Sequence, residues 1–212
     1  MGAPVGRIGY RAGVTACAAT VAYVVVQVLQ VAGVVHAPLD GILIFGTSLC
    51  IVVPFVLEML ALHYLTATDA RFWTHAALIF ATIYAVFVTA NYVVQLATVI
   101  PAKLGGTAAA IQVLDQTPHS LFWDFDALGY ICMGAATLLA VPAVGKTGFE
   151  RWVRSSLIAN AVVTPLIAVV YFYPTFSTGL LLFVGLPWAV TAPLCMGLLA
   201  IMLRKRAGAA AA

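Results

Sequence analysis

Long apolar stretches separated by short polar connections make up most of this chain. A membrane-spanning helix needs about 20 predominantly apolar residues, and six stretches reach that length. The connections are short except at 101–120, where Pro and Gly residues at both ends indicate a true loop. The pattern therefore predicts an all-α, polytopic membrane helix bundle that forms a single domain over residues 1–212. The six expected transmembrane helices are roughly 12–35, 41–65, 72–100, 121–144, 152–173 and 179–203.

Composition and charge support a membrane location and predict an orientation. Hydrophobic residues make up 64% of the chain and charged residues 8%, whereas a soluble domain has roughly 25% charged residues. Cytoplasmic loops of membrane proteins carry an excess of Lys and Arg. Nine of the ten Lys and Arg residues flank one side of the expected bundle and only Lys103 flanks the other, which predicts that both termini are cytoplasmic. The expected location is the inner (plasma) membrane of a bacterial cell, and no basic run is long enough to indicate nucleic-acid binding.

Two carboxylates at the start of the fourth span are the first candidates for chemistry, because ionisable groups inside a membrane are functional by default. Residues two apart on a helix point about 200° apart, so Asp124 and Asp126 face different partners. Asp126 shares its face with Trp123, Tyr130 and Met133, at spacings of three, four and seven residues. Asp126 is therefore the predicted functional acid, and Asp124 is expected to lie at headgroup level, where a helix N-terminus favours negative charge.

Polar residues on three helices are expected to converge with Asp126 in the outer half of the bundle. Tyr23, Gln27 and Gln30 share one face of the first helix, and Tyr84, Asn91 and Gln95 share one face of the third. The 107–114 part of the long loop is apolar enough to lie on the surface or to fold over the mouth of the bundle. Glu58, on the second helix, is expected in the inner half, roughly 16 Å from Asp126 along the membrane normal.

A buried acid among aromatic rings suits a reaction that protonates an alkene and guides the resulting carbocation. Burial in an apolar bundle disfavours the charged form of a carboxyl group, and Asn91 and Gln95 are placed to stabilise the carboxylate that remains after proton transfer. Aromatic faces stabilise cations by about 0.5–2 kcal/mol each. The same residue types also serve as hydrogen bonds between membrane helices and as the interfacial aromatic belt, so a packing role stays open. The expected substrate-binding residues are Trp123, Tyr130, Tyr84, Phe87, Tyr23, Gln27 and Trp188.

Metal and cofactor chemistry is not expected. Four histidines and four cysteines are scattered without the spacing of a metal site. The sequence has no Gly-rich phosphate loop, no nucleophile elbow and no Asp-rich motif for holding magnesium and a diphosphate. Metal-assisted ionisation of an allylic diphosphate is therefore disfavoured, whereas a reaction that begins with protonation needs no cofactor.

Two resemblances bear on the same residues. The run Asn91-Tyr92-Val93-Val94-Gln95-Leu96, with the later Pro118-His119 and Asp126-Ala127-Leu128-Gly129-Tyr130, resembles a group of small unnamed bacterial membrane proteins and implies no function. More weakly, the chain resembles the small integral-membrane terpene cyclases of meroterpenoid and prenyl-indole pathways, although the fungal members usually have seven helices. That resemblance implies that Glu58 and Asp126 correspond to the carboxylates these enzymes carry within their helices.

The leading hypothesis is a membrane-embedded, cofactor-independent terpenoid cyclase or isomerase acting on a prenylated, lipid-like substrate. Asp126 would protonate an alkene, Asn91 and Gln95 would tune the acid, and Glu58 would be a second acid or the final base. The alternative is a small proton-coupled transporter or channel in which Glu58 and Asp126 are relay sites at two depths. A third reading is a non-catalytic partner subunit whose polar residues only pack. A closed aromatic cavity open to lipid would favour the enzyme, and a continuous polar path would favour transport.

Overall fold

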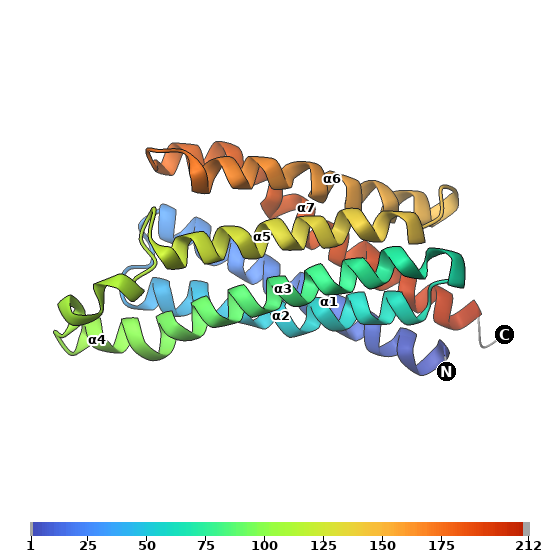
Figure 1. Ribbon diagram of the computed structural model, residues 1–212, viewed down its shortest axis with the longest axis horizontal. Coiled ribbons are helices and arrows are strands. Elements are labelled where there is room, and N and C mark those ends of the chain that lie inside the picture. The colour runs from blue at the N-terminus through green and yellow to red at the C-terminus, as the bar shows by residue number, and fades with distance from the viewer. Residues whose placement is uncertain (1, 210–212) are drawn as a thin grey trace.

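The computed structural model describes residues 2–209 as a bundle of helices (Figure 1). Six helices in this range are long and apolar enough to cross a membrane, which confirms the predicted number. The third continues through a π-helical turn at Gln95–Val99 into the short helix α4 (Ile100–Leu104). The long helices are α1 (Gly2–Val31), α2 (Leu39–Tyr64), α3 (Arg71–Val94), α5 (Leu121–Ala140), α6 (Gly148–Phe172) and α7 (Thr178–Ala209).

The helices form a closed ring rather than layers. Each long helix packs against the one before it and the one after it in the chain, and α1 closes the ring by packing along α7. Both ends of the described chain lie at the same end of the bundle (Figure 1), together with the α2–α3 and α5–α6 connections. Nine of the ten Lys and Arg residues belong to this cationic end, and Lys103 in α4 lies at the opposite end.

Apolar side chains cover the outside of the ring, and its interior holds the polar ones. Val53, Val86, Val162 and Phe183 are exposed, as expected of helices that face lipid. The buried polar residues lie inside, where a membrane bundle needs partners for them. They are Thr20, Ser48, Glu58, Thr66, Thr74, Asn91, Gln95, Asp126, Thr137, Ser156 and Asn160.

The first helix begins at Gly2, about ten residues before the predicted start, and one side of its first turns packs against α2 and α7. A Cβ atom on Gly6 would overlap Ala207 of α7, and one on Gly9 would lie 2.5 Å from the Ala61 Cβ of α2. Small residues let membrane helices approach closely. The glycines therefore extend α1 beyond the apolar run from which its start was predicted.

Hydrogen bonds to charged groups hold the α5–α6 connection against α7 at the cationic end. Arg206 donates two hydrogen bonds of 2.8 Å to the Glu150 carboxylate and one of 3.0 Å to the Ala143 carbonyl. Glu150 also accepts a 2.7 Å bond from the backbone N–H of Gly145. This end of the ring is therefore fixed by charge-assisted bonds, while the polar core lies further along the bundle.

Candidate functional site

Helix α5 places Asp126 in the interior and Asp124 outside, as predicted. The helix begins after Ser120, whose hydroxyl accepts a 3.2 Å hydrogen bond from the Trp123 backbone N–H and so caps it. Asp126 is 3% exposed, and Tyr130 and Met133 on the same face are also buried. Asp124 is exposed. The 200° separation of the two carboxylates thus assigns one to the core and one to the surface.

Two helices, α6 and α3, contribute hydrogen-bond partners to Asp126. The Tyr171 hydroxyl of α6 donates a hydrogen bond to its Oδ2 atom. The Asn91 carboxamide of α3 reaches Oδ1 at 3.5 Å, the long end of the hydrogen-bonding range, and donates a 3.0 Å bond to Gln116 Oε1. Tyr171 is therefore the main partner of the acid.

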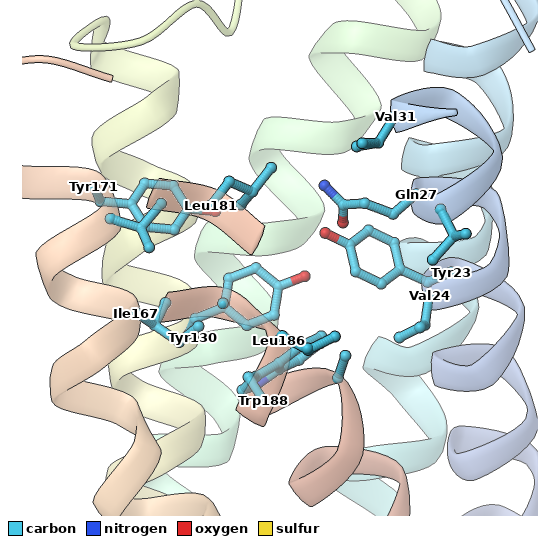
Figure 2. A pocket seen from close by; sticks show the side chains of 14 residues that line it. Tyr23, Val24, Gln27, Val31, Tyr130, Ile167, Tyr171, Leu181, Leu186 and Trp188 are labelled. Carbon is cyan, nitrogen blue, oxygen red and sulfur yellow. The ribbon is translucent and has the colours of Figure 1, made fainter. Parts of the chain in front are cut away.

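Phenol groups connect this acid to the α1 side of the ring. The Tyr92 and Tyr130 hydroxyl oxygens are 3.2 Å apart. Figure 2 shows the Tyr23 and Tyr130 hydroxyls and the Gln27 carboxamide pointing toward one another across the space between α1 and α5. Gln30 was predicted on the same face, but its Nε2 donates to Asp40 Oδ2 at 2.9 Å and joins α1 to α2 instead.

A cavity of about 100 Å³ lies beside these phenols, between α1, α5, α6 and α7 (Figure 2). Tyr171 lines it, whereas its hydrogen-bond partner Asp126 is not among the lining residues. Exposed Val28 and Leu186 form part of the wall, so the cavity adjoins the apolar outer surface. The lining residues are Tyr23, Val24, Gln27, Val28, Val31, Tyr130, Ile167, Val170, Tyr171, Leu181, Gly185, Leu186, Trp188 and Ala189.

Some of the predicted aromatic residues meet at this cavity. Trp188 is buried and packs edge-on against Tyr23 and Tyr130, with ring centroids 5.9 Å and 4.9 Å apart. Trp123 stands behind the wall, 4.6 Å from the Tyr171 ring, and its indole N–H donates to the Tyr171 carbonyl at 3.2 Å. Trp123 therefore holds Tyr171 in place and does not itself line the cavity.

Tyr84 and Phe87 lie away from the cavity lining. Tyr84 is buried against Phe55, and Phe87 packs on Phe125, with ring centroids 5.6 Å and 5.3 Å apart, respectively. Both rings fill spaces between neighbouring helices, and neither is among the residues that line the cavity.

The sequence allowed residues 107–114 either to lie on the surface or to fold over the mouth of the bundle, and the structure places most of residues 105–113 at the surface. A 3₁₀ segment, Ala108–Leu114, lies against α4 and α5. The Gln95 carboxamide holds this loop by donating to the Leu114 carbonyl at 2.8 Å and accepting from the Gln116 N–H at 3.2 Å. Gln95 therefore fastens the loop, and on the side that faces the acid it contacts Asn91 at 3.5 Å.

Glu58 is buried elsewhere in the ring. Its side chain is 0% exposed, and neither carboxylate oxygen has a hydrogen-bond partner among the described residues. It fits against Gly13 of α1, where an added Cβ would overlap its Oε1 atom. Glu58 does not line the cavity, and among the described residues no hydrogen bond joins it to Asp126.

Sequence reasoning missed Tyr171, Tyr92 and Gln116. Tyr171 follows Asn160, Thr164 and Ile167 at spacings of four, three and four residues, so the helical period of the sixth span carried the signal. Gln116 lies in a loop without periodicity, and no comparable pattern indicates its contact with Asn91.

Comparisons with protein-family models, curated proteins and solved structures found no match. Function therefore has to be inferred from the chemistry of the site. A buried acid hydrogen-bonded to a phenol that lines an apolar, aromatic cavity is suited to proton transfer to an uncharged ligand.

Proposed function

We propose that this chain is an integral membrane enzyme, a cofactor-independent cyclase or isomerase that protonates an alkene of a prenylated, lipid-like substrate. The observation that carries the proposal is the hydrogen bond from Tyr171, a cavity-lining residue, to the buried Asp126. It places an exchangeable proton in the cavity wall with an acid directly behind it. Because the outer surface next to the cavity is apolar, the substrate would enter from the lipid.

The proposed reaction begins with a proton relay. When Asp126 is protonated, its O–H donates to the Tyr171 oxygen, and the Tyr171 O–H turns toward the cavity. The Tyr171 hydroxyl then gives its proton to one alkene carbon and takes the proton of Asp126, which leaves a carboxylate and a carbocation. A second alkene of the substrate attacks the cation, forming one carbon–carbon bond. Loss of a proton from the carbon next to the final cation, through Tyr171 to Asp126, restores the acid. Substrate and product are isomers, so no cofactor is consumed.

The cavity has features that suit a cationic intermediate. The rings of Tyr23, Tyr130, Tyr171 and Trp188 surround it, and each aromatic face stabilises a cation by about 0.5–2 kcal/mol. The cavity's lining residues include no Lys, Arg or His, and this composition favours an uncharged substrate over a prenyl diphosphate. Asn91 would keep the carboxylate oriented by its contact with Oδ1.

A product assay in deuterated water tests the proposal. Membranes containing the protein are incubated with farnesyl- and geranylgeranyl-bearing indoles and phenols, and products are analysed by mass spectrometry. The expected product is isomeric with its substrate apart from one incorporated deuterium. Gly185→Leu adds a side chain at the wall of the cavity, which does not include Asp126, and should abolish conversion. Conversion that is unchanged in this variant would place the reaction elsewhere.

A proton-coupled transporter or channel is the second candidate, and Glu58 is the observation that favours it. A buried carboxyl group with no hydrogen-bond partner among the described residues is a possible proton-carrying site. Proton flux into liposomes that falls in Glu58→Gln, together with no conversion of the substrate panel, would support transport. Flux equal to that of empty liposomes would reject it.

The orientation follows from the distribution of charge. We propose that the end holding both termini faces the cytoplasm of a bacterial cell, because nine cations lie there and one lies opposite. The cavity and Asp126 then lie toward the outer leaflet. Cysteine labelling from outside the cell at Lys103→Cys, compared with Lys146→Cys, checks this orientation: only the first should react.

A further inference from the structure

A second hollow lies between α2 and α3 at the cationic end of the bundle, remote from the cavity beside Tyr171. Its volume is about 450 Å³, and its lining joins two histidines and an arginine with apolar side chains. His63 and His75, which are twelve residues apart in sequence, have ring centroids 5.6 Å apart. The lining residues are His63, Arg71, Phe72, His75, Ala76 and Ile79.

The polar groups of this hollow retain free donors. Arg71 donates from Nε to the Thr66 carbonyl at 3.3 Å, and its two terminal nitrogens donate to no other residue in the described part of the chain. The Thr74 hydroxyl donates to the Arg71 carbonyl at 3.2 Å and lies 3.0 Å from His63 Nδ1, so the His63 N–H donates to Thr74 and fixes the ring. Asp69, in the preceding turn, is exposed and forms neither of the ion pairs found in the described residues. An anion can therefore accept from the Arg71 guanidinium and the His75 imidazole, which are both exposed.

The apolar side of the hollow continues along the lipid-facing surface. Phe72 is 73% exposed and Ile79 48%, and seven residues of helix carry the surface about 10 Å deeper along the bundle. A ligand that fits both parts has an anionic head at Arg71 and a hydrocarbon tail along α3. The net positive charge of this end of the bundle complements an anionic leaflet.

We propose that this hollow binds the phosphate head of an anionic phospholipid, with one acyl chain lying along Phe72 and Ile79. The phosphate oxygens accept hydrogen bonds from the Arg71 guanidinium and from the His75 ring. Guanidinium–phosphate contacts of this kind are charge-assisted and strong. The proposal is independent of any catalytic function, since the hollow and the tyrosine-lined cavity share no lining residue.

Native mass spectrometry of the full-length protein tests lipid binding directly. Phosphatidylglycerol and phosphatidylcholine with identical acyl chains are titrated against the wild type, Arg71→Gln/His75→Gln and Arg151→Gln. Arg151 is the matched control, an exposed arginine at the same end whose guanidinium lies over Trp152. The wild type should prefer phosphatidylglycerol, the double variant should lose about tenfold in affinity for it, and Arg151→Gln should stay within twofold. Equal affinity for both lipids, or equal loss in both variants, would overturn the proposal.

Two further measurements distinguish a lipid site from a site for a free anion and locate the bound lipid. Inorganic phosphate at the same concentration should not displace the lipid; displacement would show a site for a free anion and refute the lipid assignment. A photoactivatable phosphatidylglycerol should crosslink in the wild type to the peptide containing Phe72–Ile79, which needs no variant to fold. Crosslinks found only on other helices would also contradict the proposed site.

Discussion

Replacing Gly13 with alanine should destabilise the bundle where α1 meets both α2 and α7. The new Cβ would overlap the Glu58 carboxylate and lie 2.7 Å from the Cβ of Ala200. The glutamate side chain is buried and has to shift, and the alanine Cβ moves only with its helix, so α1 and α7 must separate. Overpacking of this kind costs about 1–3 kcal/mol, while alanine gains about 1 kcal/mol over glycine in a helix.

Gly46→Ala is the matched control, because Gly46 lies in α2 with no atom within 4 Å of its added Cβ. Both substitutions share the propensity gain, so the difference between them isolates the packing cost. Thermal unfolding in detergent should place Gly13→Ala below Gly46→Ala by about 1–3 kcal/mol, or roughly 2–12 °C in Tm for a chain of this size. Equal melting temperatures would refute the close approach of the helices.

A double-mutant cycle tests whether the Glu58 carboxylate really lies against Gly13. In a Glu58→Ala background, the cost of Gly13→Ala should fall by about half, because the clash with Ala200 remains. Residues in contact show interaction energies of about 0.5–3 kcal/mol. Additive effects of the two substitutions would mean that Glu58 does not occupy this position.

Three other outcomes are expected. Lys103→Asp breaks the 2.7 Å ion pair with Asp115 and should speed backbone hydrogen exchange in residues 105–117 up to about fivefold. Adding Asp115→Lys should restore the wild-type exchange rate, and no recovery would mean that the ion pair does not stabilise the loop. Asn160→Leu removes hydrogen bonds to two threonines and should lower unfolding stability by about 1 kcal/mol; an unchanged Tm would mean that these bonds contribute nothing. Tyr171→Phe should reduce turnover by about a hundredfold or more with substrate binding unchanged, and full turnover would contradict its place in the proton relay.

The six spans were predictable from the sequence because they follow from the lengths of the apolar stretches. The burial of Asp126 and the exposure of Asp124 were predictable because they follow from the helical period. The order of the ring was less accessible. It depends on the close contact of α1 with α7, through glycines such as Gly6 that no apolar run identifies. Periodicity says which face of a helix is polar, but it does not say which helix lies opposite that face.

The candidate site was predicted in part for the same reason. Tyr23, Tyr130 and Trp188 meet at the cavity as expected. Gln95, expected beside the acid, instead fastens the loop, because the backbone groups of Leu114 and Gln116 compete for its carboxamide. Contacts made by loop backbone depend on how the loop folds, and residue type and spacing alone do not encode them.

The most direct test of the central claim compares Asp126→Asn with Asp124→Asn in the deuterated-water assay. The two residues lie on one helical turn, one 3% exposed and the other exposed to the surroundings, so the pair separates the buried acid from charge in general. Proton-initiated cyclisation predicts that Asp126→Asn makes no deuterium-labelled isomer, while Asp124→Asn makes it at close to the wild-type rate. Labelled product from folded Asp126→Asn protein would show that this carboxyl group is not the acid.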